Sequence, residues 1–324
     1  MDPTRLSIVV PVYQGERTLD ALLAELAPLT EFQDTPQGRP FRVVDVVLVH
    51  DGAVDGSQQV MERLAERLPF ITTVWLSRNF GQHPATLAGM AATTGDWVAT
   101  LDEDGQQDPA DLGRMLDTAL QRATPLVYAA PVNPPPHGAL RNWLSRAVKL
   151  AVGRIVGNPQ IVDINSFRLV RGDIARSLAA YCGHGVYLDV ALSWIVDRWA
   201  TCPVTLRAEG GRPSGYGLRK LFAHFGRLIL TAGTRPLRLI SVLGFVSILV
   251  AVVLSSVMVW QRLMQQIPVP GYTSLLVAIC FFSGGILFSL GVIAEYLAVT
   301  LSMAMGRPLF VTTSRPQRQD RPAP

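Results

Sequence analysis

The chain has few cysteines and few charged residues, and each scarcity excludes certain classes of protein. Only 3 cysteines occur in 324 residues, and the spacing of Cys182, Cys202 and Cys280 fits neither a disulfide framework nor a zinc site. Charged residues make up 17% of the chain, and the net charge of +4 is too modest to indicate binding to nucleic acid. We therefore expect a protein of a reducing compartment with no nucleic-acid partner.

A secretory signal peptide and an internal repeat of solenoid length are also missing from the sequence. The first apolar stretch, Leu6–Val12, is short, and a turn-like Gln14-Gly15 pair follows it. We expect the large N-terminal part of the chain to stay in the cytoplasm.

Apolar sequence is abundant and is concentrated near the C-terminus. Hydrophobic residues make up 49% of the chain, and neither Leu239–Trp260 nor Tyr272–Ala294 contains a charged residue. Each stretch is long enough to cross a hydrocarbon core of about 30 Å, which takes about 20 helical residues. Trp260 and Tyr272 stand at the ends that face the short connecting loop, as is typical of membrane interfaces. We predict two transmembrane helices within residues 237–306, although a buried helix hairpin is the alternative.

The arginines around these stretches indicate an orientation. The loop of residues 261–271 contains a single cation, Arg262, whereas Arg235 and Arg238 precede the first stretch. Residues 307–324 form a basic tail after the second. Because cytoplasmic flanks are enriched in Lys and Arg, we expect a multi-pass protein of the cell (inner) membrane with both termini in the cytoplasm.

Two amphipathic segments precede the first apolar stretch. Within the region 211–236, the apolar residues of Gly217–Leu230 recur at helical spacing, and Arg219, Lys220 and Arg227 mostly occupy the other side. Leu140–Ile155 shows a similar pattern. A half-buried helix explains either segment, but next to a membrane span a basic amphipathic helix is expected to lie in the headgroup layer.

Short apolar runs alternate with helical patterns through the first 130 residues, which indicates a doubly wound α/β domain with a mostly parallel sheet over residues 1–210. The candidate strands are Leu6–Val12, Val43–Val49, Ile71–Leu76, Trp97–Leu101 and Leu126–Ala130. The candidate helices are Thr18–Leu29, Ser57–Leu68, Pro84–Thr93 and Pro109–Ala123.

An acidic motif, Asp102-Glu103-Asp104-Gly105-Gln106, follows the fourth candidate strand. Two carboxylates at i and i+2 and an amide at i+4 offer the hard oxygen ligands that Mg²⁺ or Mn²⁺ prefers. Open α/β sheets bind ligands beyond the carboxyl ends of their strands. A metal site is therefore one interpretation, and a solvated acidic turn is the other.

Several ordered motifs together resemble polyprenyl-phosphate glycosyltransferases of glycosyltransferase family 2, in the dolichol-phosphate-mannose-synthase-like group. The resemblance runs from Leu6 to about Val311. Besides the acidic motif, it rests on Pro11-Val12-Tyr13-Gln14-Gly15-Glu16, His50-Asp51-Gly52-Ala53-Val54-Asp55-Gly56-Ser57, Leu76-Ser77-Arg78-Asn79-Phe80-Gly81-Gln82-His83 and Asp163-Ile164-Asn165-Ser166-Phe167-Arg168-Leu169. It implies a GT-A-type domain, amphipathic interfacial helices, two transmembrane helices and a homo-oligomer, a tetramer in the family.

The resemblance also implies roles for individual residues. The donor would be bound by Pro11, Tyr13, Glu16, Asp51 and Arg78. Asp104 and Gln106 would bind the metal directly, with Asp102 completing or supporting the site. The acceptor phosphate would be bound by Ser166, Arg168, Arg212, Arg219 and Lys220. Asp102, Asp104 and Arg168 are then the catalytic candidates, although a buried structural arginine is the alternative for Arg168.

Some positions depart from the family pattern. His50 replaces the usual first acid of its motif, and Gly215 replaces a lysine. Glu103 stands where the family usually has alanine, and we expect its side chain to point away from the metal or to compete for it. The replacement by His50 bears on base selectivity and on the choice of donor, whereas Arg212, Arg219 or Lys220 would supply the charge that is missing at Gly215.

The expected reaction is an inverting, metal-dependent transfer of a sugar from a nucleotide-sugar donor to polyprenyl phosphate at the cytoplasmic membrane face. UDP-glucose is the favoured donor, with GDP-mannose, UDP-GlcNAc or an aminoarabinose donor as alternatives. A phosphate acceptor is already negatively charged, so the absence of an evident Ser-His-Asp or Cys-His arrangement is expected. A glycan synthase with a hydroxyl acceptor and a non-catalytic scaffold are the other hypotheses.

Overall fold

The computed structural model describes residues 3–133, 164–183, 187–207 and 272–314, together with single residues between 244 and 264. The chain divides into two compact units. The first comprises Met1–Gly153, Asn158–Tyr216 and Arg307–Pro324, and the second comprises Arg154–Gly157 and Gly217–Gly306.

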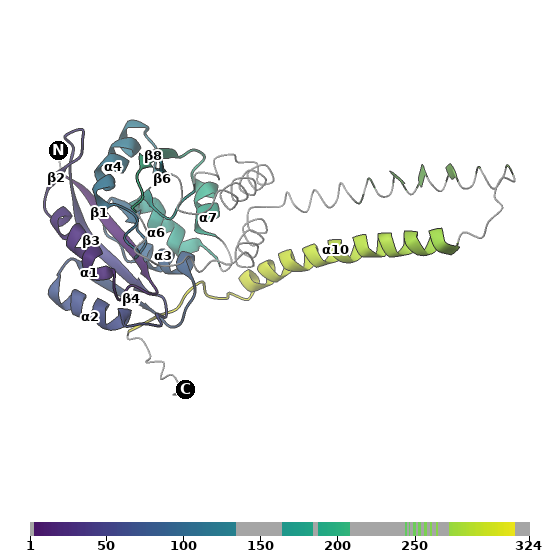
Figure 1. Ribbon diagram of the computed structural model, residues 1–324, viewed down its shortest axis with the longest axis horizontal. Helices are drawn as coiled ribbons and strands as arrows, with labels where there is room; N and C mark the ends of the chain where they lie inside the picture. The colour runs from purple at the N-terminus through teal and green to yellow at the C-terminus, as the bar shows by residue number, and fades with distance from the viewer. Residues whose placement is uncertain are drawn as a thin grey trace, which may run out of the picture. The chain divides into compact units, whose positions relative to one another are not determined.

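A mixed β-sheet forms the centre of the first unit (Figure 1). Among the described residues its order is β8-β6-β7-β5-β1-β3-β4-β9, and β2 pairs with β3. The strands are β1 (Thr4–Val12), β2 (Gln33–Asp34), β3 (Pro40–His50), β4 (Ile71–Leu76), β5 (Trp97–Thr100), β6 (Leu126–Pro131), β7 (Arg168–Arg171), β8 (Ala200–Val204) and β9 (Thr312–Thr313).

Helices cover both faces of this sheet, as the alternation of apolar runs and helical patterns predicts. They are α1 (Leu19–Leu26), η1 (Ala27–Thr30), α2 (Ser57–Arg67), α3 (Gln82–Ala91), η2 (Pro109–Asp111), α4 (Leu112–Gln121), α6 (Gly172–Tyr181) and α7 (Leu188–Ile195). Side chains alternate between the faces of a strand, so Ile8 and Val10 of β1 pack with α1, α2 and α4. Val9 packs with α3, α6 and α7 on the other face. The doubly wound α/β prediction is confirmed.

The prediction of a mostly parallel sheet is confirmed, because β1, β3, β4, β5, β6 and β8 run in one direction and only β2, β7 and β9 of the described strands run against them. β1, β3, β4 and β5 are parallel neighbours. β7 lies antiparallel between β5 and β6, and Thr100 pairs with Arg168 in its register. A four-residue strand that pairs with distant segments carries little local signal, so the sequence alone does not predict β7. The insertion of β7 brings Ser166 to the end of β5.

The described start of the basic tail belongs to the first unit. β9 pairs antiparallel with β4, and the Ser77 N–H donates to the Val311 carbonyl at 2.9 Å. Leu309 and Phe310 pack against the apolar cluster on the α3 face. These residues therefore add an edge strand to the sheet, next to the loop that follows β4.

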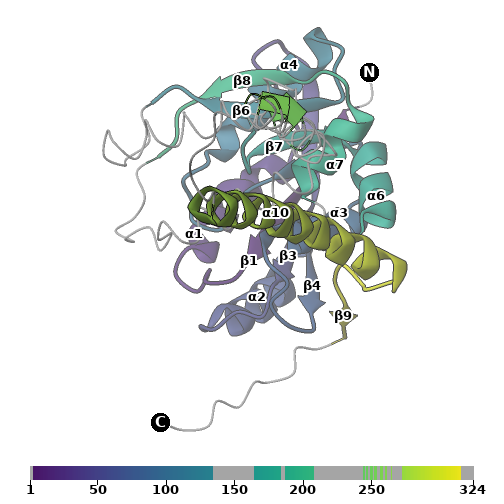
Figure 2. The ribbon, with the colours of Figure 1, turned by 90° about the vertical axis from the view of Figure 1, so that its right-hand side faces the viewer.

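The second unit contains α10 (Tyr272–Ala304), one unbroken helix of 33 residues (Figure 2). It continues past Ala294, where the uncharged stretch ends, since neither glycine nor proline occurs between Ala294 and Gly306. Gly306 has a φ of 64°, and its N–H donates to the Met303 carbonyl at 3.0 Å. A glycine at positive φ is a common helix terminator.

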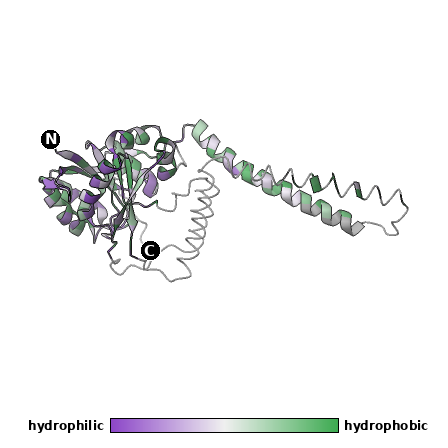
Figure 3. Ribbon diagram, turned by 90° about the horizontal axis from the view of Figure 1, so that it is seen from above, coloured by the Kyte–Doolittle hydropathy of each residue, from purple (hydrophilic) through white to green (hydrophobic). Residues whose placement is uncertain are grey.

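Most of α10 is coloured white to green on the hydropathy scale of Figure 3. Phe282–Ala304 is long and apolar enough to cross a membrane, and it is the one such helix found in the part of the chain that the structure describes. Large apolar side chains of α10 are exposed, including Leu287 and Phe288. Most of the first predicted span and both amphipathic segments, with Arg212, Arg219 and Lys220, lie outside the described residues, so the prediction of two spans stays a prediction.

Candidate functional site

The candidate site is built from four loops at the carboxyl edge of the sheet. The loops follow β1, β3, β4 and β5, which are neighbours in the sheet and run in one direction. β1 lies between β3 and β5, so the order of the strands reverses at β1. Ligands of open α/β sheets bind at such a switch point. The acidic motif therefore stands where a ligand site is expected.

The acidic motif forms a tight turn after β5. Gly105 has a φ of 73°, a conformation that glycine adopts without steric cost. The Gln106 N–H donates to Asp104 Oδ1 at 3.0 Å. Asp102, Asp104 and Gln106 are all half-buried. The turn thus keeps these three oxygen-bearing side chains within one short loop.

The carboxylate of Asp102 is fixed by three side chains from three segments. Gln82 Nε2 donates to Oδ1 at 2.6 Å. Gln107 Nε2 and Ser166 Oγ both donate to Oδ2, at 2.8 and 2.5 Å. Gln107 Oε1 also accepts the Asp102 N–H at 2.9 Å. The sequence reasoning selected Ser166 but missed Gln82 and Gln107, although both lie within quoted motifs.

The electrostatics around Asp102 favour a cation. Burial raises the pKa of Asp102, and the nearby Asp104 carboxylate raises it further, whereas the Ser166 hydrogen bond and the charge of Arg168 lower it. In the described residues no group of three or more His, Cys, Asp or Glu side chains could hold a metal. Two carboxylates and the Gln106 amide still fit a Mg²⁺ or Mn²⁺ ion whose other ligands are water and phosphate oxygens.

The loop after β1 is tied to the loop before α2. The Gly15 N–H donates to Ser57 Oγ at 2.8 Å. The Glu16 N–H donates to Asp55 Oδ2 at 3.3 Å, and Glu16 Oε2 accepts the Gly56 N–H at 3.0 Å. Glu16 thus makes structural contacts between two loops of the candidate donor site. Pro11 is half-buried at the end of β1, and the Tyr13 side chain is exposed.

Asp51 joins the loop after β3 to the loop after β4. Its buried carboxylate accepts the N–H groups of Phe80 and Gly81 at 2.7 and 2.9 Å. The backbones meet closely here, because a Cβ on Gly52 would lie 2.6 Å from the Asn79 nitrogen. The exposed Arg78 guanidinium stacks over the Phe80 ring at 4.3 Å. The two donor candidates Asp51 and Arg78 therefore belong to adjoining loops.

Asp51 is expected to make stability depend on pH. Burial raises its pKa from 3.8 to about 6, against the opposing effects of its backbone hydrogen bonds and Arg78. Between these values the folded protein binds more protons than the unfolded chain. The stability that this carboxyl contributes is present below pH 3.8 and is lost as the pH rises to about 6, by up to about 3 kcal/mol.

The measurement is the thermal midpoint of the full chain and of Asp51→Asn between pH 4.5 and 7.5. The midpoint of the wild type should fall relative to that of the variant as the pH rises through 6. A constant difference between the two proteins over this range would contradict the shifted pKa.

Arg168 lies behind the site rather than open to a ligand. Its side chain is buried on β7, and its Nη1 forms a short ion pair with Asp189 Oδ1. Asp189 also accepts the Tyr128 hydroxyl at 2.8 Å. The prediction that Arg168 binds a phosphate is not tested by these contacts, but its placement favours the alternative of a buried structural arginine. Ser166, by contrast, contacts Asp102 directly.

His50, the departure from the family pattern, is also buried. Its ring lies 5.2 Å from the ring of Trp75. Burial lowers the pKa of His50, while Asp55 and Glu62 oppose that shift. Its Nδ1 is enclosed and has no hydrogen-bond partner among the described residues. The replacement therefore puts a buried ring, whose charged form is disfavoured by burial, at a position where the family usually has an acid.

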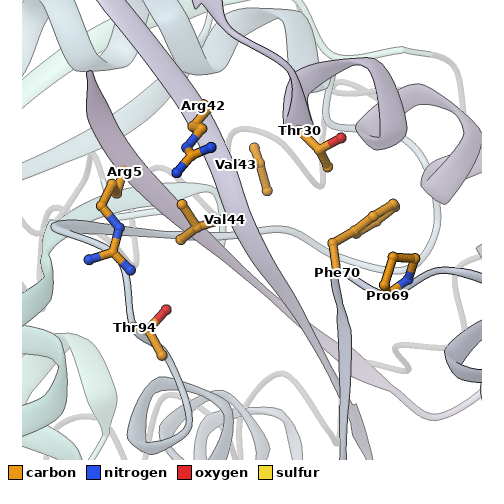
Figure 4. A pocket seen from close by; sticks show the side chains of 8 residues that line it. All are labelled: Arg5, Thr30, Arg42, Val43, Val44, Pro69, Phe70 and Thr94. Carbon is orange, nitrogen blue, oxygen red and sulfur yellow. The ribbon is translucent and has the colours of Figure 1, made fainter. Parts of the chain in front are cut away.

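A cavity of about 480 Å³ lies at the opposite edge of the sheet (Figure 4). Arg5 and Arg42 line it from the amino ends of β1 and β3, beside Thr94 and Phe70. Asp45 accepts the Thr94 N–H at 3.1 Å, and Asp96 accepts the backbone N–H of Arg5 at 3.0 Å, so acidic side chains bond to two of the residues that line the cavity. None of the candidate site residues that the structure describes lines this cavity.

The sequence matches a known family. Residues 7–178 match the family described as Glycosyl transferase family 2. This range begins in β1 and ends in α6, and it contains all four loops of the candidate site.

Curated relatives match over nearly the whole chain. The undecaprenyl-phosphate 4-deoxy-4-formamido-L-arabinose transferase of Pseudomonas paraeruginosa (strain DSM 24068 / PA7) is 31% identical over 312 residues, which cover 94% of this chain and 88% of that protein. The bactoprenol glucosyl transferase of Shigella phage SfX is 26% identical over 312 residues, covering 96% of this chain and 99% of the phage protein.

A solved structure shares the fold. Glucosyl-3-phosphoglycerate synthase from Mycobacterium tuberculosis, crystallised with Mn²⁺, UDP-glucose and phosphoglyceric acid, superposes with a TM-score of 0.50 at 19% identity. The match covers 72% of this chain and 79% of that one. The similarity agrees with the mixed α/β architecture of the first unit.

Proposed function

Because the chain belongs to glycosyltransferase family 2, we propose that it transfers a sugar from a nucleotide-sugar donor to a polyprenyl phosphate with inversion at the anomeric carbon. The observation that carries the proposal is the pair Asp102 and Asp104, which stands at the switch point of the sheet beside the loop after β1. The names of the two curated relatives support an undecaprenyl-type acceptor.

Two donors deserve priority. UDP-glucose is the first, since the phage glucosyl transferase matches this chain over 99% of its own length. A nucleotide-activated 4-deoxy-4-formamido-L-arabinose is the second, since relatives of that name reach 31% identity. Tyr13, Asp51 and Arg78 stand on the three loops that would receive the nucleoside and phosphates of either donor.

The residues of the acidic motif would hold Mg²⁺ or Mn²⁺. Asp104 and Gln106 would bind the ion directly, and Asp102 would complete the site in the orientation set by Gln82, Gln107 and Ser166. A bound divalent cation stabilises the negative charge that gathers on a departing diphosphate.

The proposed reaction needs no proton transfer. A negatively charged oxygen of the acceptor phosphate attacks the anomeric carbon and forms a new C–O bond. The bond from that carbon to the donor diphosphate breaks, and the nucleoside diphosphate leaves with the electron pair. The task of the protein is to align the two substrates, and well-oriented reactants gain a large part of the rate in this way.

The acceptor requires a place at a membrane. We propose that Phe282–Ala304 of α10 spans the bilayer together with the first apolar stretch, and that both termini lie in the cytoplasm. Arg212, Arg219 and Lys220 would then bind the acceptor phosphate near the headgroups. A homo-oligomer, a tetramer by resemblance, stays a prediction.

In the test, membranes that contain the full chain are incubated with undecaprenyl phosphate, Mg²⁺ or Mn²⁺, and each of a panel of labelled nucleotide sugars. Label is expected in the organic phase with one donor, and the active donor identifies the sugar. Label in a water-soluble or insoluble polymer would instead indicate a glycan synthase with a hydroxyl acceptor. No transfer with any donor, from correctly inserted protein, would favour a binding scaffold.

A further inference from the structure

Glu103, between the two aspartates of the acidic motif, is bound to the end of β1. Its Oε2 accepts the Tyr13 N–H at 2.9 Å, and its Oε1 accepts the Gln14 N–H at 2.8 Å. Successive backbone N–H groups form a concave site for an anion. Here the anion is the carboxylate of Glu103, which lies 89 residues after Gln14 in the chain.

The backbone at Gly15 lies so close to the Glu103 carboxylate that only glycine leaves room for it. A Cβ on Gly15 would lie 2.8 Å from Glu103 Oε2 and 2.8 Å from Leu19 Cγ. Any larger residue at position 15 would therefore have to displace the carboxylate or the Leu19 side chain. The Gly15 N–H itself donates to Ser57 Oγ. The N–H groups of three successive residues thus donate to side chains of distant segments, Glu103 after β5 and Ser57 at the start of α2.

These bonds also separate Glu103 from its acidic neighbours. Asp104 Oδ1 accepts the Gln106 N–H within its own turn, and Asp102 is bound by Gln82, Gln107 and Ser166. Both oxygens of the Glu103 carboxylate instead accept N–H groups of the loop after β1. Hydrogen bonds to a charged acceptor are among the stronger ones in proteins.

We propose that Glu103 is a positioning residue that holds the nucleoside-binding loop after β1 against the metal-binding loop after β5. The two loops would then receive the nucleoside and the diphosphate of the donor as one preorganised unit. This inference rests on the proposed function for its kinetic consequence, whereas the contact itself stands independently of it. It also assigns a role to the position where the family usually has alanine.

The kinetic test compares the full chain with Glu103→Ala and Glu103→Gln in detergent-solubilised membranes. For Glu103→Ala, the donor KM is expected to rise about tenfold, equivalent to about 1.4 kcal/mol of binding. The metal concentration that gives half-maximal rate should stay unchanged. Glu103→Gln should fall between the two proteins, because an amide oxygen still accepts one of the two bonds.

Two further variants distinguish the expected rise in donor KM from a general loss of folding or activity. Glu66→Ala, an exposed glutamate on α2, should behave like the wild type. Gly15→Ala disturbs the same carboxylate from the other side and should raise the donor KM as Glu103→Ala does. A donor KM that falls would mean that the carboxylate competes with the donor, and a changed metal requirement would make Glu103 a ligand. Either result overturns the proposal.

Hydrogen–deuterium exchange provides a readout that needs no activity. In the wild type the amides of Tyr13 and Gln14 should be protected, and Glu103→Ala should speed their exchange by about tenfold or more. Unchanged exchange would overturn the proposed contact. A wild type that transfers no sugar contradicts the proposed function, whereas an active wild type with unchanged Glu103 kinetics contradicts only the inference.

Discussion

Replacing Asp104 with alanine is expected to abolish sugar transfer while the protein stays folded. Asp104 stands in the turn after β5, and its carboxylate would bind the metal that faces the donor diphosphate. We expect kcat/KM to fall by about a thousandfold, which corresponds to about 4 kcal/mol of lost transition-state stabilisation. The side chain is half-buried and belongs to a loop, so the thermal midpoint should change little.

The measurement is transfer of labelled sugar to undecaprenyl phosphate, with Mn²⁺ binding followed in parallel by calorimetry. Asp104→Asn tests charge at nearly constant shape, and Asp20→Ala is a matched control, since Asp20 is exposed on α1 and pairs with Arg63. Loss of transfer together with loss of Mn²⁺ binding supports the metal site. A variant that keeps a tenth or more of the wild-type rate would place the metal ligands elsewhere.

Much of the first unit could be predicted because its signals are local. The strand predicted at Leu6–Val12 is β1 at Thr4–Val12, and the helix predicted at Ser57–Leu68 is α2 at Ser57–Arg67. A run of apolar residues bounded by turn residues identifies the strand, and apolar residues at helical spacing identify the helix, without knowledge of their neighbours. The same holds for the position of the acidic motif at the end of β5.

Contacts between distant segments could not be predicted in this way. β9 has two residues and pairs with β4, more than 200 residues earlier in the chain. Gln82 contacts Asp102 from the start of α3, and nothing in the spacing of glutamines indicates that contact. Glu103 was expected to point away or to compete for metal, and its bonds to the β1 loop follow only from the strand order, which brings β1 beside β5.

Arg168 is a second residue whose surroundings depend on a contact between distant segments. A Ser-Phe-Arg motif beside an acidic loop suggests a phosphate ligand, because arginine is well suited to bind phosphate. Whether its guanidinium is open to a ligand depends on a partner that the motif does not contain. That partner is Asp189 on α7. The surroundings of Arg168 therefore lead to a prediction about stability.

Replacing Asp189 with alanine is expected to destabilise the protein by about 3–5 kcal/mol. Arg168, Asp189 and Tyr128 are all buried, and Asp189 Oδ1 accepts from both of the others. The substitution leaves the Arg168 guanidinium buried without its partner charge, which is the costly way to break such a pair. The loss should appear in urea unfolding of the full chain in detergent, followed by tryptophan fluorescence, since Trp199 packs against Tyr128 at 5.8 Å.

The double variant Arg168→Met/Asp189→Leu distinguishes a structural role of the ion pair from a role of Arg168 in binding a substrate phosphate. If the pair is structural, removing both charges should cost less stability than Asp189→Ala alone, because no unpaired charge stays buried. The double variant should then transfer sugar at a rate within about tenfold of the wild type, provided that Ser166 still orients Asp102. A stable double variant without transfer would show instead that Arg168 acts on a substrate phosphate. The two interpretations of Arg168 that the sequence leaves open therefore predict opposite results for one protein.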